Sequence, residues 1–164
     1  MLHNIMRTVD RIVKFDSVDA HCDIPCKIYD PSAAQIAALS VVRMIDILNE
    51  LDGSNQDLAY LNTVSRVVAE KEISARKVKD EVRIIWGDYI KAPQLEKYPE
   101  LHDLAHSIML LASKTKVTVD REAAVELVGK VNRFAEIFWA TKDVKTKTAK
   151  CPYPPALDTV YPDL

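Results

Sequence analysis

Apolar residues at three- and four-residue spacing between Asp57 and Tyr89 constrain the fold of this chain more than any other feature. This spacing is the period of an α-helix with one buried face, so residues 57–89 are predicted to form a long amphipathic helix. The chain also contains only three glycines, which favours helices over tightly turned sheets. The stripe, interrupted only at Lys71, consists of Leu61, Val64, Val68, Ala75, Val78, Val82, Ile85 and Tyr89.

The preceding segment predicts another helix, from Ser32 to Leu51. Asp30 can cap its start, and Pro31 suits a first turn, where a backbone N–H would have no partner. Its narrow polar stripe consists of Arg43, Asp46 and Glu50. Such a wide apolar face needs more than one neighbouring helix to cover it, and "DGSN" ends the helix.

Two further helices are predicted, the first opened by Pro99 and the second capped by Asp120. Their apolar stripes are Leu101, Leu104, Ile108 and Leu111 in the first, and Leu127, Val131, Phe134 and Phe138 in the second. The segments "KAPQLEKYPE" and "SKTKVTVD" are predicted to be loops. Short links between apolar-striped helices predict an all-α fold, an antiparallel four-helix bundle over residues 31–142.

The two ends of the chain lie outside the predicted bundle. Residues 1–20 precede it, and the tail, residues 143–164, contains prolines that forbid a helix. The tail has little regular hydrophobic pattern, and no strand pair is predicted in the chain. At 164 residues, the chain is expected to form a single domain.

Composition argues against several classes of function. The net charge is −2 with mixed signs, so neither nucleic acid nor an anionic membrane is expected as a partner. No apolar run approaches the ~20 residues of a membrane span, and Asp10, Arg11 and Lys14 interrupt what would be a signal-peptide core. A cytoplasmic location is therefore expected, where cysteines more often bind metal or catalyse than form disulfides.

Two of the three cysteines lie in "HCDIPCKIYDP", which begins at His21. The spacing of Cys22 and Cys26 does not match a zinc knuckle, and alone it leaves a metal site and ordinary buried thiols equally open. Asp23 and Pro25 favour a turn that brings the two sulfurs together. If the chain were cut before His21, the new α-amine, the next backbone nitrogen and both thiolates could form a square plane. That geometry suits Ni(II) or Cu(II), with the imidazole as an axial ligand.

This segment resembles the nickel hook of the nickel-containing superoxide dismutases, whose signature is HCDxPCGxYDP. The resemblance continues in "WGDYIKAPQLEKYPELH", residues 86–102, and in "IFWATK", residues 137–142. It implies a superoxide dismutase with one nickel ion per subunit, bound in a hook of residues 21–30. It also implies a precursor whose leader, residues 1–20, is removed by a maturation peptidase. The implied assembly is a homo-oligomer, namely a hexamer.

The resemblance also implies roles for residues. The implied nickel ligands are the amine and ring nitrogens of His21, the backbone nitrogen and sulfur of Cys22, and the sulfur of Cys26. Thiolate and deprotonated amide ligands stabilise Ni(III), so the metal can take an electron from one superoxide and return it to the next. Tyr29 and Tyr89 match tyrosines that restrict access and hold ordered water. Asp23 matches a further signature position and is the third candidate catalytic residue.

Three positions depart from the family pattern. Lys27 stands where the signature has glycine, and it is expected to need only an ordinary backbone conformation and to add positive charge near the entrance. Ala37 and Ser74 align with a glutamate and an arginine that orient the axial imidazole in other members. The tail is longer than the family leads one to expect, and Cys151 within it is expected to be a free thiol.

Two other classes of function stay open: a non-enzymatic carrier of nickel, copper or zinc that uses the same hook, and a helical interaction protein with incidental cysteines. His102 and His106 lie four residues apart on one predicted helix, but without a nearby carboxylate they are interpreted as solvent or interface residues. Trp86 and Trp139 are interpreted as core or interface anchors.

Overall fold

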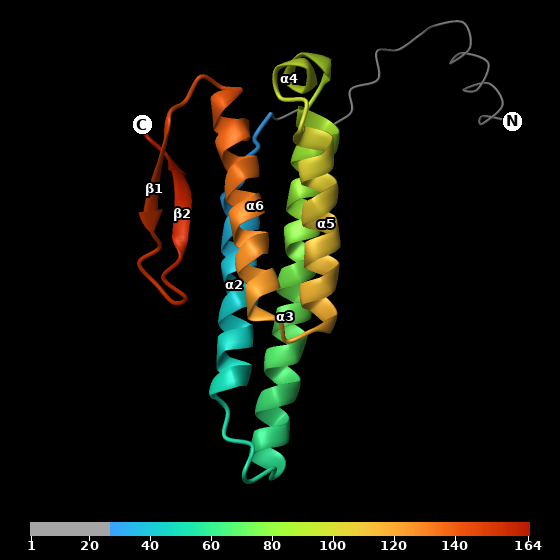
Figure 1. Ribbon diagram of the computed structural model, residues 1–164, viewed down its shortest axis with the longest axis vertical. Coiled ribbons are helices and arrows are strands. Elements are labelled where there is room, and N and C mark those ends of the chain that lie inside the picture. Colours follow the sequence, from blue (N-terminus) through green and yellow to red (C-terminus); the bar gives the residue numbers. More distant parts are fainter. Residues whose placement is uncertain (1–26) are drawn as a thin grey trace, which may run out of the picture.

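The computed structural model describes residues 27–164, so the leader and the ligand-bearing part of the hook lie outside the described residues. Four long helices are α2, Ser32–Glu50; α3, Leu58–Ile84; α5, Leu101–Val117; and α6, Arg121–Ala140. They form an antiparallel bundle, as predicted (Figure 1). α2 packs against α3 and α6, and α5 packs against the same two helices, so the four close a ring around one core.

The predicted apolar stripes face this core over most of their length. Its largest fully buried side chains include Val78, Val82, Leu101, Ile108, Leu127, Val131, Phe134 and Phe138. Leu61, also predicted to be buried, is 49% exposed. The reason is geometric, because the start of α3 extends beyond the turn that joins α5 to α6 (Figure 1).

Lys71, which interrupts the α3 stripe, is buried, with 2% of its surface exposed. Its Nζ donates to the carbonyl oxygens of Thr115 (2.7 Å), Lys116 (2.8 Å) and Thr118 (2.7 Å). These groups lie at the end of α5, where carbonyls lack partners within the helix. The ammonium therefore caps α5 from inside the bundle, and desolvation lowers the pKa of Lys71.

Both segments predicted to be loops contain helix. "KAPQLEKYPE" includes the short helix α4, Ala92–Lys97, whose start is closed by a hydrogen bond from Lys91 N to Gln94 Oε1 (3.0 Å). Pro99 precedes α5 instead of opening it, and α5 continues through "SKTKV". Thr115 in that segment is fully buried, so tertiary packing extends the helix beyond its apolar stripe.

The prediction that the chain holds no strand pair is wrong. β1, Thr146–Lys150, and β2, Asp158–Pro162, form an antiparallel hairpin in the tail, along α6 (Figure 1). β1 is exposed after its first residue and shows no apolar alternation, whereas Thr159 and Val160 of β2 are each 3% exposed. Backbone pairing therefore defines the hairpin more than side-chain pattern does. Cys151, which follows β1, is a buried free thiol, as expected.

α2 is long and apolar enough, by length and composition, to cross a membrane, and it is the one such helix within residues 27–164. The qualifying window is 44% buried inside the bundle. Core helices of soluble proteins pass the same test, so the indication is weak. The absence of a membrane partner stays a prediction.

A candidate metal centre at one end of the bundle

The C-terminal continuation of α3 is a π-helix, η1, Ile85–Tyr89, in which Ile90 N donates to the carbonyl of Ile85 (3.1 Å). Single π turns widen a helix locally and are frequent at functional sites. This turn carries Trp86 and Tyr89. The predicted extent of the helix is therefore correct, but its last turn is not α-helical, and the apolar stripe held no sign of the change.

Tyr29 and Tyr89, both predicted to flank the metal, lie together, with ring centroids 5.5 Å apart. Tyr29 precedes α2 and lies three residues after Cys26, whereas Tyr89 is the last residue of η1. The Tyr89 ring also packs against Phe138 of α6, with centroids 5.1 Å apart. Three segments far apart in the sequence thus meet at the end of the bundle where α2 begins.

The hydroxyl of Tyr89 lies 2.7 Å from Thr141 Oγ1. Thr141 Oγ1 itself donates to the carbonyl oxygen of Phe138 at 2.6 Å. A hydroxyl has one proton, so the Tyr89 hydroxyl is the donor to Thr141 and keeps its own lone pairs for another donor. Sequence reasoning missed Thr141, although "IFWATK" contains it, because the sequence does not show which helix ends meet.

Lys142 adds positive charge beside the tyrosine pair. Its Nζ lies 4.6 Å from the ring centroid of Tyr89 and 5.4 Å from that of Phe138. An ammonium over an aromatic face is attracted by the ring quadrupole, and this lysine remains exposed to solvent. Sequence reasoning missed this residue too, since a lysine at a helix end is usually only a solvated charge.

The expectation that Lys27 needs only an ordinary conformation is wrong. Its φ is 57°, in the left-handed region of backbone space. Glycine reaches this region without strain, whereas a residue with a Cβ atom pays roughly 1–2 kcal/mol there. The backbone conformation at Lys27 thus supplies a physical reason for glycine in the signature.

Ala37 and Ser74, which align with the usual partners of the axial imidazole, are 3% and 5% exposed. Ser74 Oγ lies 3.4 Å from Glu70 Oε1, one turn earlier on α3. Both positions carry uncharged side chains packed inside the bundle. Neither position therefore offers a charged side chain that could orient a ligand.

The two histidines of α5 are both exposed, and Trp86 Nε1 donates to His102 Nδ1 at 3.1 Å. Residues 27–164 contain no group of three or more His, Cys, Asp or Glu side chains that could hold a metal. These observations agree with reading His102 and His106 as solvent or interface residues. Trp86 and Trp139 are partly buried against the core, as expected of anchors.

The predicted ligands His21, Cys22 and Cys26, and the candidate Asp23, lie outside the described residues. Two thiolates with amine, amide and imidazole nitrogens would suit nickel. The described chain begins at Lys27, one peptide bond after Cys26, at the end of the bundle that holds the tyrosine pair. The donor chemistry of these residue types therefore fits nickel.

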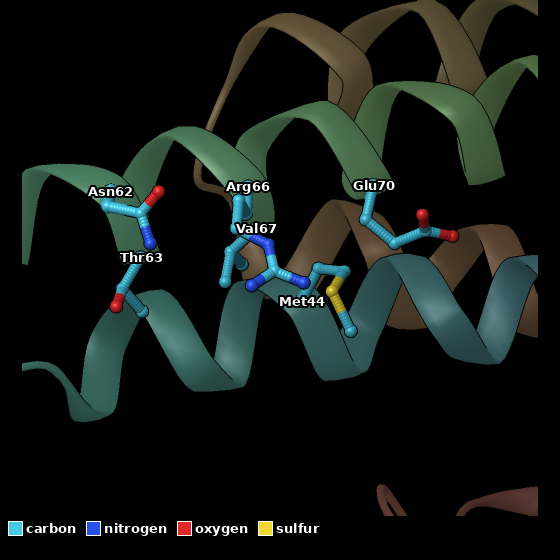
Figure 2. A pocket seen from close by; sticks show the side chains of 6 residues that line it. All are labelled: Met44, Asn62, Thr63, Arg66, Val67 and Glu70. Carbon is cyan, nitrogen blue, oxygen red and sulfur yellow. The ribbon is translucent and has the colours of Figure 1, made fainter. Parts of the chain in front are cut away.

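A separate groove of about 330 Å³ lies between α2 and α3, away from η1. Its walls are Met44 from α2 and Asn62, Thr63, Arg66, Val67 and Glu70 from α3 (Figure 2). The single carboxylate of this set, Glu70, is no basis for a metal site. The candidate chemistry is therefore concentrated at the other end of the bundle.

The fold and the sequence together define a class of protein, an antiparallel helical bundle preceded by a candidate metal-binding segment. The family model for nickel-containing superoxide dismutase matches residues 16–142. The nickel superoxide dismutase of Streptomyces coelicolor is 36% identical to this chain, and the match covers 77% of this chain and 91% of that protein. The nickel superoxide dismutase of Streptomyces seoulensis is 35% identical, over 76% of this chain and 90% of that protein. A solved structure of native nickel superoxide dismutase is 34% identical, with a TM-score of 0.65, and the match covers 74% of this chain and 99% of that one.

The chain belongs to the nickel-containing superoxide dismutase family. It is accordingly an oxidoreductase that disproportionates superoxide, with nickel as its cofactor. The family match ends at residue 142, before the hairpin begins. The tail is thus a feature of this chain that the family match does not explain.

Proposed function

We propose that this activity resides in the hook. Nickel is held by the amine and ring nitrogens of His21, the backbone nitrogen and sulfur of Cys22, and the sulfur of Cys26. The contact between Tyr29 and Tyr89 carries the proposal, because it holds the last residues of the hook against η1. A metal held by those ligands then lies close to both tyrosines, and the Asp23 side chain supports the turn between the two cysteines.

When bound, nickel supplies a couple that takes an electron from one superoxide and passes it to a second, giving dioxygen and, with two protons, hydrogen peroxide. Tyr29 and Tyr89 narrow the approach, so that the small substrate enters and larger molecules do not. The Tyr89 hydroxyl is fixed by Thr141 and accepts a hydrogen bond from ordered water with its free lone pairs. That water provides a route by which protons reach the product.

Lys142 attracts the anionic substrate toward the tyrosine pair. Its Nζ is held over the Tyr89 ring and is open to solvent, which places a positive charge at the approach. A charge of this kind raises the local concentration of an anion and its rate of encounter with the site. Lys27, which directly follows the proposed ligand Cys26, adds a second positive charge to the same end.

The mature chain begins at His21, after a peptidase has removed residues 1–20. Before that cleavage the His21 nitrogen is an amide, which is a poor ligand unless it loses its proton. The donor set is therefore complete only in the processed chain. Maturation thus precedes activity, and the processed protein works in the cytoplasm.

The processed chains assemble into a hexamer. Support comes from large apolar side chains left exposed on the described surface, among them Ile36 (53%), Leu58 (85%), Ile73 (54%) and Leu110 (59%). Contact with other copies would remove such surface from water. Light scattering on the processed protein checks this, and a monomer at micromolar concentration would contradict it.

Intact mass under native conditions, together with a superoxide assay, tests the function as a whole. The expected result is loss of residues 1–20, one nickel ion per chain and fast turnover. A carrier of nickel or copper would bind metal without turnover, and a helical interaction protein would hold no stoichiometric metal. Full nickel loading and turnover in the unprocessed chain would refute the requirement for cleavage.

A further inference from the structure

The hairpin lies beyond the family match, yet it is firmly attached to the bundle. Thr159 and Val160 of β2 and Cys151 before it are each 2–3% exposed. The hairpin contacts α6 along one side of the molecule (Figure 1). A segment with so many exposed polar residues would not bury these side chains unless something specific held it there.

A network of amide groups holds it. Gln35 Nε2, on α2, donates to the carbonyl of Val160 (2.8 Å) and to Asn132 Oδ1 (2.9 Å), on α6. Asn132 Nδ2 in turn donates to the carbonyl of Asp158 (2.8 Å), and Val160 N donates to Asn132 Oδ1 (3.3 Å). Gln35 is only 6% exposed, so these bonds are largely shielded from water. The network ties β2 to two helices at once.

Gln35 lies one turn beyond the segment Tyr29–Ser32, which joins the ligand-bearing part of the hook to α2. This segment is here named the hook root. The backbone N of Gln35 donates to the carbonyl of Pro31 (3.1 Å), and Ser32 N donates to Asp30 Oδ1 (2.7 Å). One small cavity of about 110 Å³ is lined by Asp30, Ser32 and Gln35 together with Tyr153, Tyr161 and Pro162 of the hairpin region. The hook root therefore lies against the hairpin as well as against Tyr89.

We propose that the hairpin is a positioning element for the metal-binding hook, acting through Gln35 and Asn132. By fixing the hook root, it sets the point and direction from which the ligands reach the metal. Groups that orient metal ligands without touching the metal commonly change metal affinity by about 10–100-fold. This inference rests on the proposed function, because it takes the hook ligands as given.

The test uses the processed, nickel-loaded protein with its C-terminal tail intact. Gln35→Met keeps the side-chain volume but removes both donated hydrogen bonds, and Asn132→Ala breaks the same network from α6. The control is Asp46→Ala, which removes the 2.6 Å bond from Arg121 and so also unlinks α2 from α6, but away from the hairpin. The measurements are the rate of nickel loss to a chelator and the Ni(III) electron-spin-resonance spectrum.

Both network variants are expected to lose nickel roughly tenfold faster than the wild type and to show a broadened or shifted spectrum. The Asp46→Ala control is expected to match the wild type in both. Wild-type rates and spectra in the two network variants would overturn the proposal, as would equal losses in the control. If Gln35→Met does not fold, Asn132→Ala decides the question alone. A wild-type protein that holds no nickel would instead overturn the proposed function.

Discussion

The two ends of the bundle are built on different principles. At the η1 end, the backbone departs from regular geometry in a π turn and in the left-handed conformation of Lys27, and aromatic rings and a cation gather around Tyr89. At the other end, regular helices are closed by caps. Lys71 caps α5, and Asp120 Oδ1 accepts from Ala123 N (3.0 Å) at the start of α6.

This difference separates chemistry from stability. Irregular backbone costs free energy, and it persists at functional sites because the surrounding structure holds it there. Capped helix ends satisfy buried polar groups and stabilise the fold without taking part in any reaction. Changes at one end should therefore affect turnover with little effect on unfolding, and changes at the other should do the reverse.

The largest effect is expected at the hook. Replacing Cys22 or Cys26 by serine should lower turnover by more than about a hundredfold, because a hydroxyl is harder to deprotonate and a poorer donor to nickel than a thiol. Helix content by circular dichroism should remain that of the wild type. Cys151→Ser is the matched control and should be nearly silent. Loss of nickel in that control would mean that the tail, too, contributes to the metal site.

At the capped end, Lys71→Met is expected to lower stability and leave turnover unchanged. Three carbonyls at the end of α5 lose a charged donor, while the cost of burying the ammonium disappears. The net loss in free energy of unfolding should be about 3 kcal/mol, measured by chemical denaturation. Nickel content and turnover should be unchanged at temperatures where the variant is folded. A variant that keeps wild-type stability would show that water replaces the ammonium fully.

A smaller effect tests whether positive charge at the η1 end attracts superoxide before it reaches the site. Lys142→Gln removes the charge over the Tyr89 ring. At low salt it should lower the second-order rate constant for superoxide dismutation by about two- to threefold. Added salt should erase the difference, since ions screen such attraction. Lys147→Gln makes the same charge change on β1 and should have less effect. A salt-independent loss would point to ring packing instead of steering.

The helices were predictable because apolar residues recur at three- and four-residue spacing over several turns, and one polar residue does not hide that pattern. Lys71 looked like a fault in the stripe, and only the position of the α5 end explains it. The hairpin could not be predicted, because β1 is polar and its pairing rests on backbone groups common to every sequence. Short helices such as α4 depend likewise on local hydrogen bonds that carry little pattern.

At the site, motif residues alone predicted the hook ligands, which lie outside the described residues, and the two tyrosines, which the structure brings together. The contact between the two tyrosine rings could not be predicted, because it depends on the π turn at the end of α3 and on α6 lying beside it. Thr141 and Lys142 gain their roles only from that arrangement. The error at Lys27 has the same origin, since residue type does not report backbone conformation.

The smallest effect concerns the cap on α6. The pKa of Asp120 is lowered, first by the hydrogen bond from the backbone of Ala123 and then by the 2.7 Å ion pair with Lys114. A carboxylate whose pKa is depressed in the folded state stabilises the fold at any pH above its unfolded-state pKa. That contribution is lost as the pH falls through its folded-state pKa. Asp120→Asn keeps an acceptor for Ala123 but loses the charge. Its unfolding temperature should lie slightly below that of the wild type at neutral pH and converge with it in acid.

Lys114→Gln removes the same ion pair from the other side and serves as the control. Its unfolding temperature should fall below that of the wild type by no more than that of Asp120→Asn does. Turnover should be unchanged in both variants, because neither residue approaches the tyrosine pair. Thermal unfolding across the acid range, followed by circular dichroism, measures the convergence. A deficit that persists in acid would assign the effect to the geometry of the cap rather than to its charge. A change in turnover would break the separation between the two ends.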